Sequence, residues 1–122
     1  MHLRGVDFVL FAVSDLGRAV HFYRETLGLR CTLESAEYQW AEFDCGNVTL
    51  ALQGAALPAG ERAGGRLALA VAEVAGAHAE LTARGVPVDG PPVDSGYCTA
   101  FAAFDPDGNR LILHRRADGS SG

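Results

Sequence analysis

The segment "AAFDPDGNRLIL", residues 102–113, repeats a pattern that the chain has already used in "AEFDCGNVTLAL", residues 41–52. Each segment places Gly and Asn between two apolar runs, which is the sequence pattern of a β-hairpin. In the later copy Pro106 presets φ and Gly108 supplies positive φ, so this turn is well specified. The repetition predicts two copies of one structural unit.

The residues before the earlier hairpin predict a strand, a helix and a further strand. The helix is expected to begin with Ser14 as its N-cap and to end at Gly28. Its apolar residues recur at helical spacing: Leu16, Ala19, Val20, Tyr23 and Leu27. The expected elements of the first copy are strand 6–13, helix 14–28 and strands 29–35, 38–44 and 48–54.

The second copy repeats this order. Its expected elements are strand 66–72, helix 73–85, a short strand 86–88, a Pro/Gly-rich loop 89–96 and hairpin strands 98–104 and 110–116. We also align Phe43-Asp44 with Phe104-Asp105, and Gly46-Asn47 with Gly108-Asn109.

These elements predict an α+β fold of two βαβββ modules, residues 5–53 and 65–115. One such module exposes an apolar sheet face, so we expect the two sheets to form a curved mixed cup within a single domain, residues 1–116. Residues 54–65 form the expected linker. Residues 117–122 lack apolar side chains and are expected to be a disordered tail.

Composition argues against several classes of partner. The 122 residues carry a net charge of −5, with no basic cluster larger than Arg115-Arg116, so nucleic acid is not an expected partner. No apolar run approaches the roughly 20 residues of a membrane-spanning helix. The three cysteines show no CxxC spacing, which favours free thiols in a reducing cytoplasm over disulfides or a zinc site.

Two segments carry a family resemblance: "FVLFAVSDLGRAVHFYRETLGL", residues 8–29, and "FDPDGNRLILH", residues 104–114. Together with the internal repeat, they resemble the vicinal oxygen chelate superfamily, which includes glyoxalase I, extradiol dioxygenases and bleomycin-resistance proteins. The resemblance covers residues 5–115. It implies a cup in which the family's enzymes hold a divalent metal with His and Glu side chains.

The metal ligands that the resemblance implies are missing from this chain. The corresponding positions hold Phe8, Arg66 and Ile112, and we take Leu50 as the counterpart of Ile112 in the first copy. A phenyl ring and aliphatic chains offer no lone pair, and a guanidinium is a cation without an acceptor. We therefore expect no metal and no other cofactor, and we place the chain near the metal-free, bleomycin-resistance-like branch.

An apolar ligand site is expected instead. If Phe8 faces the interior, strand alternation places Leu10 beside it, and Ile112 brings Arg110 and His114 to its own face. The expected site is aromatic or apolar with a few polar anchors: Phe8, Leu10, Tyr38, Trp40, Leu50, Arg66, Tyr97, Phe101, Arg110, Ile112 and His114. Alternatively, the apolar members pack the core, and Arg66 and His114 lie in solvent at strand ends.

Three functions are compatible with these residues. The favoured one is a homodimeric, non-catalytic cytoplasmic protein that sequesters an aromatic small molecule, such as an antibiotic, in clefts of the dimer. The second is a superfamily enzyme, a lyase, isomerase, dioxygenase or thiol transferase, with either unplaced metal ligands or His114 as a base beside Arg66 or Arg110. The third is a structural or regulatory dimer without a ligand.

Overall fold

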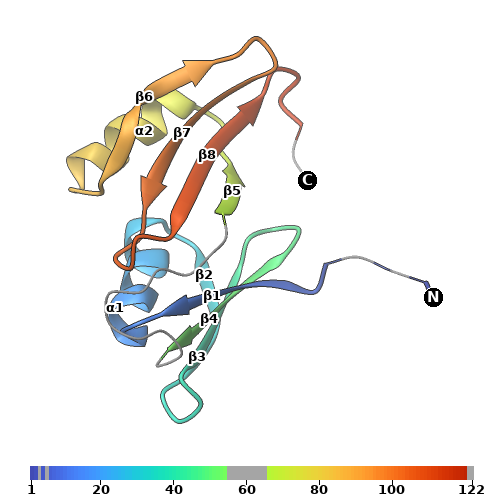
Figure 1. The fold of residues 1–122 in the computed structure, drawn as a ribbon, viewed down its shortest axis with the longest axis vertical. Coiled ribbons are helices and arrows are strands. Elements are labelled where there is room, and N and C mark those ends of the chain that lie inside the picture. Colours follow the sequence, from blue (N-terminus) through green and yellow to red (C-terminus); the bar gives the residue numbers. More distant parts are fainter. Residues whose placement is uncertain (3, 5, 55–65, 121–122) are drawn as a thin grey trace. The chain divides into compact units, whose positions relative to one another are not determined.

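Each half of the chain folds into a βαβββ module, in a computed structural model that describes residues 1–2, 4, 6–54 and 66–120 (Figure 1). The chain divides into two compact units, Met1–Ala63 and Gly64–Gly122. The two-module organisation that the repeat predicts is therefore confirmed. Each unit is described by itself below.

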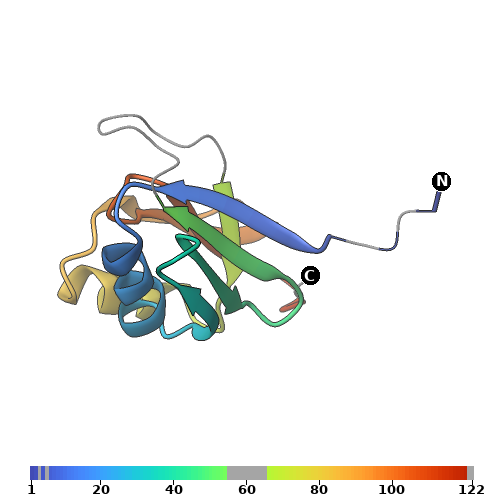
Figure 2. The same cartoon turned by 90° about the horizontal axis from the view of Figure 1, so that it is seen from below.

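The first unit forms a four-stranded mixed sheet in the order β1-β4-β3-β2. Its elements are β1 (Phe8–Val13), α1 (Leu16–His21), a π-helical turn η1 (Phe22–Thr26), β2 (Arg30–Ser35), β3 (Trp40–Asp44) and β4 (Thr49–Gly54). Strands β1 and β4 run parallel, as the two neighbouring arrows in Figure 2 show. The other two pairings are antiparallel.

The second unit repeats this topology in the order β5-β8-β7-β6, with β5 parallel to β8. Its elements are β5 (Arg66–Ala70), α2 (Val74–Ala83), β6 (Val88–Asp94), β7 (Cys98–Phe104) and β8 (Arg110–Arg116). Helix α2 lies beside β6 and β7 (Figure 1). In both units the helix connects two strands that do not pair with each other directly.

One face of each sheet is buried under the helix of its own unit. In the first unit the Tyr23 and Phe43 rings lie 5.7 Å apart between centroids, and in the second unit His78 of α2 contacts Phe101 at 4.9 Å. The helix-covered residues of the first sheet are Phe11, Val13, Ala41, Phe43, Leu50 and Leu52, all of them buried. Burying these apolar side chains is the main stabilising contribution to each unit.

The predicted helix 14–28 differs from the expectation in its N-cap residue and in the helix type of its second half. Asp15, rather than Ser14, is the N-cap, and its carboxylate accepts the Arg18 amide N–H at 3.0 Å. From Phe22 onwards the helix widens into a π-helical turn, with Leu27 N–H donating to Phe22 O. The wider turn accompanies the burial of two consecutive rings, Phe22 and Tyr23, which pack edge to face.

The prediction of a loop over residues 89–96 is wrong, because residues 88–94 form strand β6. Proline lacks an amide donor and is therefore confined to edge strands and bulges, and β6 is an edge strand. Its register against β7 shifts between Asp89 and Val93, so Pro91 and Pro92 lie within an irregularity of the ladder. Gly90 takes the positive φ of 74° there.

The two hairpin turns do not align as the sequence motif suggested. In the first unit the last β3–β4 pair is Asp44 with Thr49, whereas the last β7–β8 pair in the second unit is Phe104 with Arg110. The second turn is therefore one residue longer than the first. The last paired residue before the turn is Asp44 in the first unit and Phe104 in the second, so Phe43 lies one position further from its turn than Phe104 does. Phe43 consequently points to the helix-covered face, and Phe104 points to the opposite face.

The remaining expectations concern the linker and the tail. Apart from Gly54, the predicted linker 54–65 lies outside the described residues, as do residues 121–122. Residues 117–120 form a turn in which Ala117 N–H donates to Tyr97 O and Gly119 N–H donates to Arg116 O. Within the described residues, no helix is both long and apolar enough to span a membrane.

The two turn aspartates provide a test of how the second hairpin is stabilised. Asp105 is buried and accepts hydrogen bonds from the amides of Asp107 and Asn109 and from the Asn109 side chain. Asp105→Ala leaves these donors unsatisfied, so we expect a loss of about 3 kcal/mol in the free energy of urea unfolding. The exposed Asp44 carboxylate accepts one hydrogen bond from the described residues, from the Gly46 amide, and Asp44→Ala should cost about 1 kcal/mol or less. Equal losses for the two variants would contradict this assignment.

Candidate functional site

Each sheet has a second face, opposite its helix, which we call the open face. Paired residues on neighbouring strands point to the same side of a sheet, and successive residues along one strand alternate. In the first sheet the open face carries Phe8, Leu10, Ala12, Trp40, Glu42, Asp44, Thr49, Ala51 and Gln53. In the second it carries Arg66, Ala68, Ala70, Cys98, Ala100, Ala102, Phe104, Arg110, Ile112, His114 and Arg116.

The open face of the first sheet exposes large apolar side chains. Phe8 and Leu10 are 48% and 42% exposed although they lie on a strand of the sheet. The Phe8 ring meets Trp40 edge to face, with 6.0 Å between the ring centroids. These two rings come from β1 and β3, so the sheet brings together aromatic residues that are 32 positions apart in the sequence.

Glu42 fixes the orientation of Trp40. The indole Nε1–H donates to Glu42 Oε1 at 3.1 Å, and no side chain among the described residues donates to the other carboxylate oxygen. Our sequence analysis missed Glu42, although it follows Trp40 by two residues on a strand and therefore shares its face. Together the three side chains present two π-surfaces and an anionic hydrogen-bond acceptor.

The open face of the second sheet is basic. Arg110 donates from Nη2 to Asp89 Oδ2 at 2.9 Å, and its guanidinium lies 5.5 Å from the centre of the Phe104 ring. Arg66 pairs in register with Arg110 on the neighbouring strand. Asp89 was missed because it fell in the segment predicted as a loop, and Phe104 was missed because the turn was aligned one residue out.

Small side chains surround Ile112 and His114 on this second open face. Alanine occupies the paired positions on both neighbouring strands, at Ala68 and Ala102 beside Ile112 and at Ala70 and Ala100 beside His114. Alanines on both sides of a branched side chain leave space above the sheet, since they project only a methyl group. Ile112 and His114 are half-buried.

The structure places Leu50 and Phe101 on the helix-covered faces, so the expected grouping of these two residues is wrong. Leu50 is 0% exposed and pairs with Val9, the neighbour of Phe8 whose side chain points the opposite way. Phe101 is 4% exposed and packs against His78. The error for Leu50 arose from the turn alignment, because the register counterpart of Ile112 is Ala51.

The two tyrosines lie on hairpin turns rather than on a sheet face. Tyr38 precedes β3 and is 75% exposed, and Tyr97 precedes β7 and is 87% exposed. The remaining expected residues divide between the two open faces. Phe8, Leu10 and Trp40 belong to the first face, and Arg66, Arg110, Ile112 and His114 belong to the second.

The side chains at the expected metal positions do not fit a divalent cation. Phe8, Arg66 and Ile112 point to the open faces, and none of them carries a lone pair for a metal. When the two units are aligned by strand register, the counterpart of Ile112 is Ala51 rather than Leu50. An alanine side chain cannot coordinate a metal either. Among the described residues, no group of three or more His, Cys, Asp or Glu side chains could hold a metal ion.

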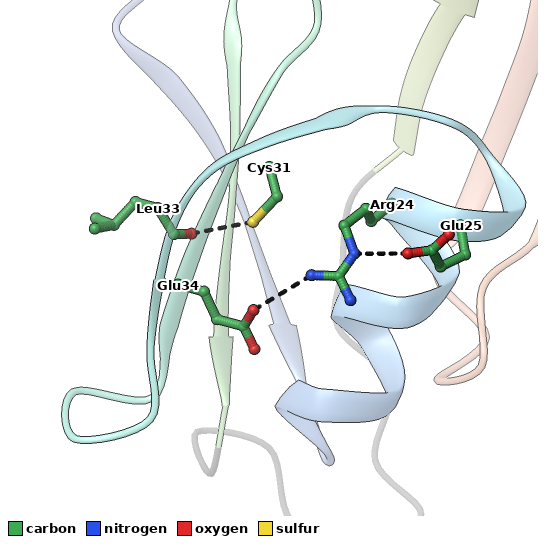
Figure 3. A network of polar contacts seen from close by, with 5 residues as sticks. All are labelled: Arg24, Glu25, Cys31, Leu33 and Glu34. Atoms are coloured by element: carbon green, nitrogen blue, oxygen red, sulfur yellow. Dashed lines mark hydrogen bonds and ion pairs between the residues drawn. The ribbon is translucent and has the colours of Figure 1, made fainter.

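A separate groove of about 530 Å³ runs beside β2 and contains polar groups that are already engaged. Arg24 pairs with Glu25 at 2.9 Å and with Glu34 at 3.5 Å, and the Cys31 thiol donates to Leu33 O (Figure 3). The hydrogen bond that Arg24 donates to Glu25 is the main cause that raises the pKa of Arg24. The Arg24–Glu34 ion pair connects η1 with the edge strand β2.

The three cysteines are free thiols of intermediate exposure. Cys45 lies in the β3–β4 turn, where burial raises its pKa. A backbone hydrogen bond partly opposes this shift and Asp44 adds to it. A raised pKa disfavours the thiolate, which is the nucleophilic form, so Cys45 does not have the character of a catalytic cysteine.

Comparison with known proteins places this geometry in a family context. Residues 5–113 match the family model described as the Glyoxalase/Bleomycin resistance protein/Dioxygenase superfamily. No protein of curated function is significantly similar to the chain in sequence.

Solved structures share the fold over nearly the whole chain. TnmS3, an antibiotic binding protein from Streptomyces sp. CB03234, is 28% identical, with a TM-score of 0.81 over 96% of this chain and 99% of that one. A member of the same superfamily from Sphaerobacter thermophilus is 26% identical, with a TM-score of 0.77 over 92% and 97%. A lactoylglutathione lyase from Agrobacterium tumefaciens is 23% identical, with a TM-score of 0.73 over 90% and 92%, and this likeness shows the fold alone.

The environment of Cys45 predicts how stability depends on pH. A folded-state pKa above the unfolded value means that the thiol favours folding below the unfolded pKa of about 8.5 and loses this contribution as pH rises through the folded pKa. The free energy of unfolding should therefore decline above about pH 8.5, and Cys45→Ala should weaken that decline. An unchanged slope in the variant, measured by urea unfolding between about pH 7 and 10, would contradict the burial of this thiol.

Proposed function

The chain belongs to the Glyoxalase/Bleomycin resistance protein/Dioxygenase superfamily, and from this premise we propose that it binds an aromatic or apolar small molecule without chemical change. The supporting observation is the exposed Phe8–Trp40 pair on the open face of the first sheet. Large apolar groups clustered at the surface of a protein mark interaction sites.

The site suits binding better than catalysis. Phe8, Leu10 and Trp40 supply contact area, and the bond to Glu42 holds the indole in one orientation, which reduces the entropy that binding must overcome. Each aromatic contact with a ligand contributes about 0.5–1.5 kcal/mol beyond its buried area. The metal positions of the superfamily's enzymes carry side chains without lone pairs, so the chain lacks that route to catalysis.

Similarity to TnmS3 supports an antibiotic as the ligand, because that protein is an antibiotic binding protein and is 28% identical to this chain over nearly its full length. In the proposed role the protein sequesters a drug and so confers resistance. Its three free thiols suit the reducing cytoplasm, where we propose that it acts.

The neutral fluorescent probe N-phenylnaphthylamine provides a test that needs no knowledge of the natural ligand. We expect saturable binding, and we expect Trp40→Ala and Phe8→Ala each to weaken it about tenfold, since each variant removes one aromatic contact and its buried area. Fluorescence of the probe reports binding in all variants, including the one that lacks the single tryptophan.

Tyr38→Ala is the matched control, because it removes an aromatic ring that is 75% exposed on a hairpin turn outside the open face. It should change the probe affinity less than twofold, a difference of about 0.4 kcal/mol. Equal losses for Tyr38→Ala and Trp40→Ala, or no saturable binding by the native chain, would overturn the proposal.

The competing enzyme function predicts different behaviour. A metal-dependent enzyme purified without chelator would carry stoichiometric zinc, iron, manganese or nickel, whereas we expect none of these by mass spectrometry of the metal content. Candidate antibiotics should also be recovered with unchanged mass after incubation. Stoichiometric metal together with a changed ligand mass would decide for the enzyme.

We propose further that the chain forms a homodimer. Val6, Phe8 and Leu10 are all more than 40% exposed along or just before β1, which is an edge strand of its sheet. Exposed apolar edge strands favour association. Sedimentation equilibrium should give about twice the chain mass of 12.8 kDa, and Leu10→Glu should shift the mass toward that of one chain. A native protein that stays at 12.8 kDa would contradict the dimer.

A further inference from the structure

The proposed function leaves open which chemical group of a ligand the second sheet would recognise. Arg66 and Arg110 occupy paired positions on β5 and β8, so both side chains leave the same face of the sheet on strands about 4.8 Å apart. Like charges directly opposite each other on neighbouring strands destabilise a sheet. An anion that binds beside this pair would reduce the repulsion between the two guanidinium groups.

Only one carboxylate among the described residues pairs with these two arginines. Asp89 accepts from Arg110, and the Phe104 ring lies beneath the same guanidinium. Arg110 is thus held in place across the open face. It keeps donors directed away from Asp89, because a guanidinium has five N–H groups and the described residues accept only one hydrogen bond from them.

Arg66 makes no ion pair or hydrogen bond with any described residue, and it is exposed. A third arginine on this face, Arg116, donates to Ser120. The positive charge of the open face therefore exceeds its negative charge. Ala68 and Ile112 continue the surface from Arg66 along the sheet and supply an apolar floor beside the guanidinium.

We infer that Arg66 and Arg110 bind an anionic oxygen group, such as a carboxylate, on an aromatic ligand whose apolar body lies over Ile112 and the neighbouring alanines. The inference rests on the proposed function, the binding of aromatic small molecules, and adds a second contact surface, within the second unit alone, that selects aromatic acids. Arg66, which makes no ion pair or hydrogen bond with a described residue, contributes one guanidinium, and Arg110, oriented by Asp89 and Phe104, contributes the second set of donors. Two guanidinium groups can share one anionic group through charge-assisted hydrogen bonds.

Two probes with one aromatic scaffold separate this inference from the proposed function. Anilinonaphthalene sulfonate carries an anionic group that N-phenylnaphthylamine lacks. We expect Arg66→Gln to weaken sulfonate binding about tenfold, the loss typical of one charge-assisted hydrogen bond. The same variant should change the affinity for the neutral probe less than about twofold.

Asp89→Asn should act in the opposite direction. It removes the carboxylate that competes for Arg110 and keeps the side-chain size, so the affinity for the sulfonate should increase while the affinity for the neutral probe stays the same. An overall effect of net charge would be produced equally by any arginine. Arg115→Gln is the matched control, because it loses the same charge from a β8 position whose side chain points to the other face of the sheet.

The outcomes are distinct for the two proposals. Failure of the neutral probe to bind the native chain overturns the proposed function. Saturable binding of the neutral probe, combined with equal sulfonate losses in Arg66→Gln and Arg115→Gln, overturns the anion site alone. Circular dichroism and urea unfolding of each variant exclude a loss of fold as the cause.

Discussion

Each unit has a four-stranded sheet with two faces, and the helix of that unit covers only one of them. The second face is therefore left without a covering element from its own unit, and the rest of the structure depends on this. The helix buries one face, where Leu50 and Phe43 in the first sheet reach full burial. Strand alternation then sends Phe8 and Leu10 to the opposite face, where they stay about half exposed. Apolar side chains at such positions gain hydrophobic stabilisation only when something else covers them, which makes the open faces the natural place for a ligand.

The two units share one topology and differ in surface chemistry. The first open face combines the Phe8 and Trp40 rings with the Glu42 carboxylate. The second combines alanines with two paired arginines, one of which is neutralised by Asp89. Because the parallel strand pairing is conserved between the units, these differences arise from side chains alone. The superfamily's fold is therefore compatible with Phe8, Arg66 and Ile112 at the positions where its enzymes hold metal ligands.

The sequence predicted the element order and the membership of most faces, because apolar periodicity reports directly on burial. It correctly placed the buried side of the first helix and the shared direction of Phe8 and Leu10. It failed where tertiary context overrides local signals. Pro91 and Pro92 read as a loop, yet an edge strand tolerates them since no neighbour needs their missing amide donors.

The site was harder to predict than the fold, since a shift of one residue reverses the face of a strand residue. The similar motifs "FDCGN" and "FDPDGN" differ by one residue in turn length, and aligning them by composition placed Leu50 on the wrong side. The same error hid Phe104, whose ring supports Arg110. Glu42 needed only the alternation rule, but its role depends on a hydrogen bond to Trp40 that the sequence does not reveal.

Chemical-shift mapping by NMR with N-phenylnaphthylamine tests the central claim most directly, because it locates the ligand surface without any substitution. The account predicts saturable shifts at the Trp40 indole N–H and at the Phe8 and Leu10 side chains, with the helix-covered Leu50 and Phe101 little affected. Shifts that centre on Leu50, Phe101 and the two helices, with the Trp40 indole unchanged, would contradict it.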